Sequence, residues 1–272
     1  MTKMTKPLQN LVLGIFTIYA LAPVYLVILA SMRSEADLFA GPLTMPWPPN
    51  WQNFSRVWTE SGFATFFMNS VKISTSVTLL VVLCAPLAGF AFAKMRFKGR
   101  EPLFALFLAG LVVPAPSLIV ALYGNLQKLG MIDSHLGVIL PQAALLLPFS
   151  VFMMRTVMQE VPDELIEAST MDGASPFGTF IRVVLPIVRP GVMSLILIVF
   201  LFSWQEYLLP LVVLQTEALK PITVGAASLQ GRYGVDYGGI AAAGLIAFAP
   251  LVVLFLVMQR SFVRGLSAGA VK

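Results

Sequence analysis

The sequence contains very few of the residues that carry metal, redox or nucleophilic chemistry. Among its 272 residues there is one cysteine, Cys84, and one histidine, His135. A lone cysteine excludes a disulfide framework within the chain, and a lone histidine excludes an HExxH zinc site and disfavours a Ser-His-Asp triad. We expect Cys84 to be an inert thiol buried in an apolar segment, and His135 to be a solvated loop residue beside Asp133.

Charged residues are scarce as well, at 11% of the chain, and the Gly-Lys dipeptide of a GxxxxGK[ST] phosphate loop does not occur. We therefore expect the chain to bind no cofactor or metal of its own, to hydrolyse no nucleotide and not to be an enzyme. The net charge of +5 comes from basic residues at the ends of apolar segments, not from one basic stripe interleaved with aromatics. Nucleic acid is therefore not an expected partner.

Apolar residues make up 58% of the chain, which is more than one soluble core of this size can bury. A membrane-spanning helix needs about 20 mostly apolar residues. Six windows of that kind occur, at residues 11–32, 70–93, 102–123, 136–154, 191–214 and 240–259. We predict an all-α polytopic membrane protein with six transmembrane helices in a single domain over residues 1–272. The first window is long and lacks a small-residue cleavage site, so we expect a retained helix there.

Basic residues are divided unevenly between the two sides that six spans create. With the N-terminus inside, twelve fall on one side: Lys3, Lys6, Lys94, Arg96, Lys98, Arg100, Arg155, Arg182, Arg189, Arg260, Arg264 and Lys272. The other side has six: Arg33, Arg56, Lys72, Lys128, Lys220 and Arg232. Because loops rich in Lys and Arg stay in the cytoplasm, we expect both termini to be cytoplasmic, together with a polar segment at residues 160–190.

Two other loops have features of their own. The external aromatic segment, residues 33–69, is rich in proline and aromatic residues, which suits either anchoring at the lipid headgroups or docking of an external protein. The basic cytoplasmic turn at residues 94–101 is expected to face anionic membrane lipid.

The polar segment carries its own helix signals. Pro162 suits the first position of a helix and Gly173 suits its end, so a short helix of about 11 residues is predicted between them. Ser175 and Pro176 repeat the start signal as N-cap and first residue of a second helix. That second helix is expected to end before Pro186.

Acidic side chains are concentrated at the start of the polar segment. Five lie within thirteen residues and no Lys or Arg lies among them: Glu160, Asp163, Glu164, Glu167 and Asp172. Such a cluster is either a solvated face or a docking element. Apolar residues alternate with the acids, namely Leu165, Ile166, Ala168 and Met171. The helix therefore has apolar side chains that a partner could bury and carboxylates that a partner could pair with. This combination favours a docking element that fills an arginine-lined groove on a partner.

Polar and helix-breaking residues inside the apolar windows indicate a second candidate region. Glu206 lies toward the outer end of the fifth window, and lipid does not tolerate a carboxylate unless it serves a function or is bonded to a neighbouring helix. Pro114 and Pro116 are expected to break the third window and to expose backbone polar groups. We predict a path through the membrane bordered by Trp204, Glu206, Tyr207, Pro114 and Pro116.

The polar segment also resembles a known motif. The EAA motif of importer-type ABC permeases, E-A-A-x3-G-x9-I-x-L-P, is matched by Glu167-Ala168-Ser169, by Gly173 at the required spacing, and by Val183-x-Leu185-Pro186. Over essentially its whole length the chain is similar to the carbohydrate-uptake group of these permeases, and in particular to the second permease of maltose-type importers. The segments that carry this similarity are residues 31–33, 53–54, 69–70, 91–93, 204–210 and 259–272.

The resemblance implies a transport subunit in the bacterial cytoplasmic membrane. Its implied partners are a second related permease, two ATPase subunits that hold ATP and magnesium, and an external solute-binding protein or lipoprotein that delivers a carbohydrate. In this family the EAA loop docks as a coupling helix on an ATPase subunit. Carried over by position, the coupling residues are Glu167, Ala168, Ser169, Asp172, Gly173 and Ala174. The tail residues implied at the ATPase interface are Arg264, Gly265 and Lys272.

On this view the single domain has three parts: the first helix with the external aromatic segment (1–69), a five-helix transport core (70–259) and a cytoplasmic tail (260–272). Other functions stay open. An ABC permease for glycerol phosphate, a polyamine or another small polar solute would share the EAA loop. A secondary transporter would place more ionisable groups near the membrane midplane, and an intramembrane enzyme would need a catalytic set of which only Glu206 is present.

Overall fold

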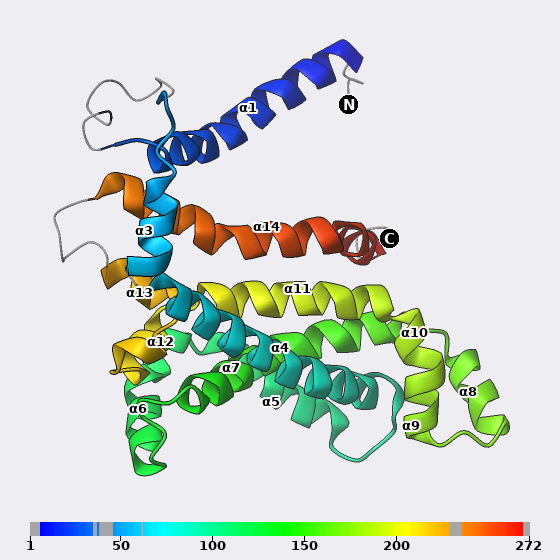
Figure 1. The fold of residues 1–272 in the computed structure, drawn as a ribbon. Coiled ribbons are helices and arrows are strands. Elements are labelled where there is room, and N and C mark those ends of the chain that lie inside the picture. The colour runs from blue at the N-terminus through cyan, green and yellow to red at the C-terminus, as the bar shows by residue number, and fades with distance from the viewer. Residues whose placement is uncertain (1–5, 35–36, 38–45, 61, 229–235, 269–272) are drawn as a thin grey trace. The chain divides into compact units, whose positions relative to one another are not determined.

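Every regular element in the described part of the chain is a helix. A computed structural model describes residues 6–34, 37, 46–60, 62–228 and 236–268, with residues 260–268 described as backbone only. The helices in chain order (Figure 1) are α1 (Lys6–Ser31), α3 (Gln52–Glu60), α4 (Phe63–Lys94), α5 (Arg100–Val112), η1 (Ala115–Leu118), α6 (Ile119–Lys128), α7 (Leu136–Gln159), α8 (Asp163–Met171), α9 (Pro176–Thr179), η2 (Phe180–Val184), α10 (Leu185–Ile187), α11 (Arg189–Gln205), α12 (Leu208–Val213), η3 (Glu217–Leu219), α13 (Ile222–Ser228) and α14 (Tyr237–Ala268). The all-α fold class is confirmed.

The helices that could span a membrane fall in the predicted apolar windows, and the third window is divided between two helices. By length and composition, α1, α4, α7 and the part of α14 up to Gln259 could each cross a membrane, and two bent helix pairs raise the number to six. One pair joins α5 to η1 and α6 with a bend of 92°, and the other joins the α9–α10 stretch to α11 with a bend of 81°. The chain divides into two compact units: a first unit, residues 1–67 with 225–250, and a second unit, residues 68–224 with 251–272.

Within the first unit, α3 joins the end of α1 to the start of α14. The side-chain amide of Asn53 donates hydrogen bonds of 2.9 Å to the carbonyl oxygens of Ser31 and Arg33. On the same helix, Arg56 forms an ion pair with Asp236, the residue before α14. A single buried asparagine therefore satisfies carbonyl groups that the end of α1 leaves without helical partners.

The external aromatic segment supplies both surface and core. Trp47, Trp51 and Trp58 are exposed, whereas Phe63 and Phe66 are buried in the first unit. Exposed tryptophans suit either the headgroup level of a membrane or an external partner, and ordinary core packing accounts for the two buried phenylalanines. Residues 35–36, 38–45 and 61 of the segment lie outside the described residues.

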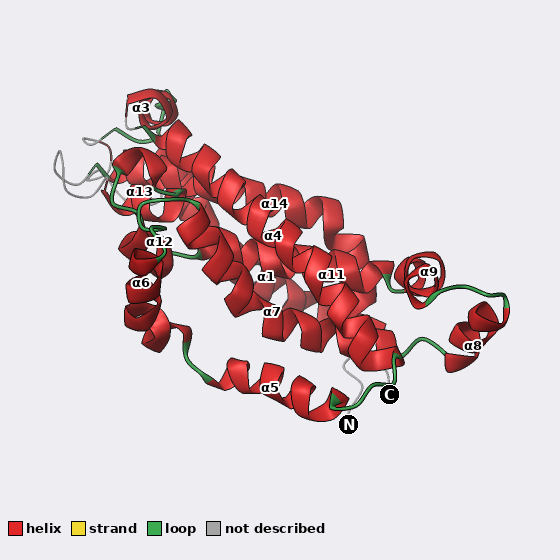
Figure 2. Ribbon diagram, turned by 90° about the horizontal axis from the view of Figure 1, so that it is seen from below, coloured by secondary structure: helices red, strands yellow, loops and turns green. Residues whose placement is uncertain are grey.

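Within the second unit, α7 is the central helix. It packs against both α5 and α11, and its residues Val151, Met154 and Met158 are buried. A polar contact fastens α7 to α11: the side-chain oxygen of Gln142 accepts a 2.6 Å hydrogen bond from the Ser203 hydroxyl. Figure 2 shows α8 and α9 at one end of this unit, with α6 and α12 at the opposite end.

Proline causes the break in the third span, as predicted. Val113, the residue before Pro114, is extended (φ −80°, ψ 118°), and this ends α5. Such a conformation follows from the clash between a proline ring and a helical residue before it. Pro116 then lies in the short helix η1, and α6 leaves at an angle of 92° to α5.

The fifth span ends earlier than the predicted window of residues 191–214. Helix α11 stops at Gln205 and Glu206 is extended. The cause is Pro210, which lacks the N–H that would bond the Glu206 carbonyl in a continuous helix and whose ring would clash with it. That carbonyl instead accepts a 2.8 Å hydrogen bond from the Thr223 hydroxyl.

The expected burial of Cys84 was wrong, and His135 lies in a loop as expected but is less solvated than expected. Cys84 is exposed on the surface of α4, so its apolar neighbours in sequence did not predict its burial within the chain. His135 is half-buried and its Nε2 lies 3.0 Å from the carbonyl oxygen of Leu219. Because a carbonyl only accepts, that nitrogen carries a proton, and His135 fastens the loop before α7 to η3.

Candidate functional site

The polar segment folds as two short helices with a sharp turn at Gly173. Helix α8 ends there, and Gly173 has φ +79°, a left-handed conformation that glycine adopts without a Cβ penalty. The N–H of Gly173 donates to the carbonyl of Thr170, and the N–H of Ala174 donates to that of Ser169, both at 3.0 Å. The predicted stop at Gly173 is confirmed, although α8 has nine residues and Pro162 is its N-cap, not its first residue.

The second helix begins as predicted and ends differently. Ser175 is the N-cap, and its hydroxyl accepts a 3.2 Å hydrogen bond from the N–H of Gly178. The prediction that the helix ends before Pro186 was wrong, because α9 continues through η2 and α10 to Ile187. η2 is a π-helical turn, in which the N–H of Leu185 bonds the carbonyl of Phe180. This wider turn leaves room for the ring of Pro186.

The outer faces of α8 and α9 carry exposed apolar side chains. Met171 is 87% exposed, and four more large apolar residues of the segment are exposed with it, namely Leu165, Phe177, Ile181 and Ile187. Other apolar residues of the segment face inward. Phe180 and Val184 are buried in the core of the second unit, and Ile166 packs against that core. A polar segment that leaves these large apolar side chains exposed offers a surface for a partner.

The predicted coupling residues divide between this surface and the interior of the segment. Glu167, Ala168, Asp172 and Gly173 are exposed, and Ala174 is half-buried. In the described part of the chain, the Glu167 side chain makes no hydrogen bond and no ion pair, so its carboxylate is available to a partner.

Ser169 lies on the inner side of α8 and is buried, so its expected role in close approach of a partner is replaced by a role inside the segment. Its Oγ lies 2.7 Å from the Thr179 Oγ1 and donates to the carbonyl of Ile166 at 3.0 Å. Since Ser169 has one hydroxyl proton, Thr179 is the donor of the pair. This chain of hydrogen bonds fixes α8 against α9.

Lys94, at the end of α4, holds the start of α8. Only 6% of its side chain is exposed, and its Nζ donates to the Val161 carbonyl at 2.5 Å and to the Asp163 Oδ1 at 2.6 Å. The hydrogen bond from Lys94, followed by its charge, holds the pKa of Asp163 below its usual value. Sequence reasoning missed Lys94 because the two groups are 69 residues apart.

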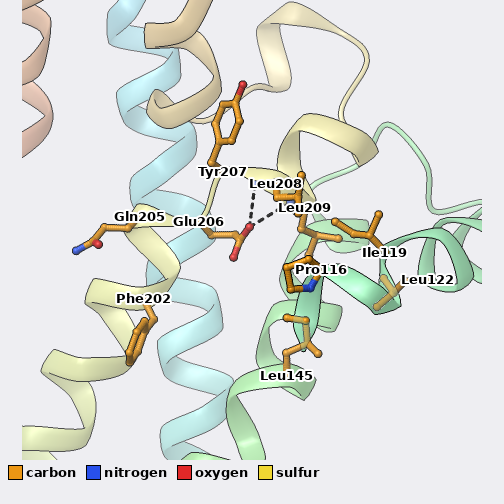
Figure 3. A pocket seen from close by; sticks show the side chains of 11 residues that line it. Pro116, Ile119, Leu122, Leu145, Phe202, Gln205, Glu206, Tyr207, Leu208 and Leu209 are labelled. Carbon is orange, nitrogen blue, oxygen red and sulfur yellow. Dashed lines mark hydrogen bonds between the residues drawn. The ribbon is translucent and has the colours of Figure 1, made fainter. Parts of the chain in front are cut away.

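A cavity of about 390 Å³ lies within the second unit, where the third and fifth spans are broken. Its walls come from η1, α6, α7 and the turn between α11 and α12 (Figure 3). The lining residues are Ala115, Pro116, Ile119, Leu122, Leu145, Phe202, Gln205, Glu206, Tyr207, Leu208 and Leu209. Non-helical backbone at membrane depth is tolerated where it lines a cavity, which is what both breaks do here.

Glu206 lines this cavity and also stabilises the turn between α11 and α12, which forms part of the cavity wall. Its Oε1 accepts hydrogen bonds from the N–H groups of Leu208 at 2.9 Å and Leu209 at 3.1 Å, drawn as dashed lines in Figure 3. These are the free N–H groups of the first turn of α12, so the carboxylate caps that helix. Among the described residues, the second oxygen, Oε2, has no hydrogen-bond partner.

Three of the five predicted path residues meet at this cavity: Pro116, Glu206 and Tyr207. Trp204 is not among the lining residues; it is 3% exposed and stacks on Phe200 with ring centroids 5.6 Å apart. Pro114 shapes the break without lining the cavity. Phe202 and Gln205 line it and were not predicted as path residues, although the position of Phe202 one helical turn before Glu206 could have indicated it.

The hairpin that follows the cavity is fixed by hydrogen bonds from distant residues. The Asp133 carboxylate accepts from the backbone N–H groups of Gln215 and Thr216, at 2.8 Å each, and from the Thr216 hydroxyl at 2.5 Å. The Thr216 hydroxyl and then its N–H lower the pKa of Asp133. From α4, Asn69 donates to the Ala218 carbonyl at 2.8 Å. These polar contacts therefore hold the segment after α12 against the loop before α7 and against α4.

Of the predicted tail residues, the structure describes only the backbone of two. The backbone of Arg264 and Gly265 is helical within α14, and their side chains lie outside the described residues, as does the whole of Lys272.

Comparison with known proteins identifies the family. Residues 85–268 match the family model described as "Binding-protein-dependent transport system inner membrane component". The chain is 33% identical over 280 residues to the arabinooligosaccharides transport system permease protein AraQ of Halalkalibacterium halodurans, with 100% of both chains covered. It is 30% identical to the diacetylchitobiose uptake system permease protein NgcG of Streptomyces coelicolor, with 96% of this chain and 87% of the relative covered.

A solved structure has the same fold. A chain of a bacterial ABC transporter involved in the import of the acidic polysaccharide alginate superposes with a TM-score of 0.82 at 19% identity, covering 96% of this chain and 100% of that chain. The protein is thus a member of the binding-protein-dependent inner-membrane transport components, the permease subunits of ABC importers.

Proposed function

We propose that this chain is one of two related permease subunits of a bacterial ATP-driven importer and that it carries a carbohydrate inward across the cytoplasmic membrane. An external solute-binding protein delivers the sugar, and two ATPase subunits supply the energy. Relatives that match nearly the whole chain support a carbohydrate, since they are named for arabino-oligosaccharides and diacetylchitobiose. The chain itself is a transport subunit and leaves ATP and magnesium to the ATPase.

The surface of α8 is the observation that carries this proposal. It presents Glu167 without a partner among the described residues, beside the exposed apolar side chains of Leu165 and Met171. A groove on an ATPase subunit that offers an arginine and apolar contacts would complete both features. Ala168, Asp172 and Gly173 then face the same groove, while Ser169 keeps α8 and α9 in one orientation.

The orientation follows from the distribution of basic residues, which places both termini and the polar segment in the cytoplasm. In that orientation the cavity near Glu206 lies toward the external side, where the sugar enters. The tail residues Arg264, Gly265 and Lys272 would then reach the ATPase dimer from the cytoplasmic end of α14.

The cavity suits a sugar by its chemistry. Phe202 and Tyr207 are aromatic lining residues, a type that can stack on the C–H surface of a sugar, and Gln205 and Glu206 add an amide and a carboxylate that can bond its hydroxyl groups. These residues therefore contact the sugar as it crosses.

Uptake by proteoliposomes tests the proposal. The chain is reconstituted with its partner permease, ATPase subunits and binding protein, and labelled arabino-oligosaccharide is supplied outside. We expect uptake only when magnesium and ATP reach the ATPase. Uptake that persists after ATP depletion would favour a secondary transporter, and uptake of glycerol phosphate or spermidine in place of sugar would favour the alternative solutes.

Replacing Lys94 by methionine is expected to lower this uptake about tenfold. The substitution removes a part-buried charge-assisted hydrogen bond to the Val161 carbonyl, worth about 1.5–3 kcal/mol, and also leaves the exposed Asp163 carboxylate without its donor. The start of α8 is then no longer fixed to α4. Lys98→Met is the matched control, because Lys98 is exposed on the same turn. Equal uptake by the two variants would show that Lys94 does not position α8.

A further inference from the structure

We propose that Glu206 selects solutes by charge, so that the cavity admits neutral or cationic sugars and excludes oligosaccharides that carry carboxylates. This inference rests on the proposed function and adds the class of sugar to it. It assigns two separate tasks to one side chain: Oε1 builds the turn between α11 and α12, and Oε2 meets the solute.

The charges around the cavity have one sign. Of its eleven lining residues, Glu206 is the only one that is charged, and none is Lys, Arg or His. In the described part of the chain Glu206 takes part in no salt bridge. No cationic side chain in this cavity wall would pair with a solute carboxylate, and the one charged group would repel it.

The position of the carboxylate strengthens that repulsion. Two backbone N–H groups hold Oε1, so the side chain cannot swing away without uncapping α12. In Figure 3 the Glu206 side chain extends from the turn toward the side of the cavity where Pro116 lies. Seven of the other lining residues are aliphatic or proline, and an apolar wall weakens the screening of charge by water.

A neutral sugar is attracted to Glu206 and not repelled by it. A hydroxyl group can donate to Oε2, which has no other partner among the described residues, and hydrogen bonds to an ionised acceptor are stronger than neutral ones. A protonated amino sugar can form an ion pair with the same oxygen. The cavity therefore favours a donor-rich solute and disfavours an anion of equal size.

The variant Glu206→Gln separates the two tasks. Its amide oxygen can still accept from the N–H groups of Leu208 and Leu209, so α12 keeps its cap while the negative charge is lost. Glu206→Ala removes both the cap and the charge. Glu60→Gln is the matched control for loss of one external carboxylate, because Glu60 is exposed on α3 and belongs to the first unit.

Binding is measured on the complete importer in lipid nanodiscs without the binding protein, so that the selectivity of the binding protein does not enter. Saturation-transfer NMR with maltotriose and trigalacturonate gives the affinity of each trisaccharide. For the wild-type protein we expect maltotriose to bind at least about tenfold more tightly than trigalacturonate. Glu206→Gln should reduce that ratio about tenfold with an unchanged thermal unfolding midpoint, and Glu60→Gln should leave the ratio as it is.

Three results would overturn the proposal: equal wild-type affinity for the two trisaccharides, a ratio that Glu206→Gln leaves unchanged, or no binding of either trisaccharide. The same preparation is assayed for ATP-dependent sugar uptake after the binding protein is added. Uptake that is intact alongside any of these results removes the charge selection and leaves the importer function standing. Loss of ATP-dependent uptake in the wild-type preparation removes the importer function itself.

Discussion

Replacing Glu167 by alanine is expected to lower sugar uptake by about a hundredfold or more while the chain still inserts in the membrane. Glu167 is exposed on α8 and has no partner among the described residues. Docked on an ATPase subunit, it would form a partly buried pair with an arginine. Breaking such a pair by removing one member costs about 3–5 kcal/mol, because the other charge stays buried and unpaired, and about 1.4 kcal/mol is a factor of ten.

Glu164→Ala provides the control for this prediction. Glu164 lies on the same helix and is exposed, but it belongs to the first turn and not to the EAA triplet. Uptake by this variant should stay within about threefold of the wild type, since isolated surface charges contribute little. Uptake is measured in the reconstituted importer at equal amounts of inserted protein. Normal uptake by Glu167→Ala would rule out the coupling role of Glu167.

Replacing Gly173 by proline should abolish uptake altogether. The turn between α8 and α9 requires φ +79° at this position, whereas proline fixes φ near −65°. The substitution also removes the N–H that bonds the Thr170 carbonyl. The two helices would then leave the turn in different directions, and Glu167 and Met171 could not reach one groove together. Uptake and ATP hydrolysis by the reconstituted importer are the measurements.

Asparagine at Gly173 distinguishes backbone conformation from side-chain bulk. A Cβ at this position would have no atom within 4 Å, so added volume is not the problem. Asparagine tolerates the left-handed conformation better than other residues with a side chain, and Gly173→Asn should retain most of the uptake. If the proline variant transports as well as the asparagine variant, the geometry of this turn does not matter for coupling.

Local signals in the sequence predicted the polar segment well. Ser175 caps a helix and Gly173 ends one because each acts on backbone groups within a few residues, and such effects are visible in a short stretch of sequence. The π-helical turn was not predictable in this way. The rule that a helix ends before proline assumes α-helical hydrogen bonding, and η2 avoids the clash at Pro186 by bonding one residue further back.

Contacts between distant residues could not be predicted from the sequence. The lysine that holds α8, Lys94, is 69 residues away from Asp163, and nothing in its neighbourhood distinguishes it from Lys98. Hydropathy located the fifth window but not its end at Gln205, because the apolar run continues through Pro210 and only the missing N–H of that proline reveals the break.

The sequence identified some of the residues that line the candidate cavity and misassigned others. An intramembrane carboxylate and a pair of prolines are rare enough to be noticed, and Glu206 and Pro116 do line the cavity. Trp204 was assigned to the path by its position beside Glu206, but adjacent residues on a helix point in different directions, and Trp204 is buried against Phe200.

In the proposed importer, α8 is the surface on which a separate ATPase acts. Met171, 87% exposed on α8, is the site to probe it. In a Cys84→Ser background, which removes the single native cysteine, Met171→Cys is labelled with a photoactivatable maleimide in the assembled, transport-competent importer. We expect cross-linking to the ATPase subunit, whereas the same label on Lys128→Cys should not reach it. Transport-competent complexes in which Met171→Cys never cross-links to the ATPase would contradict the account.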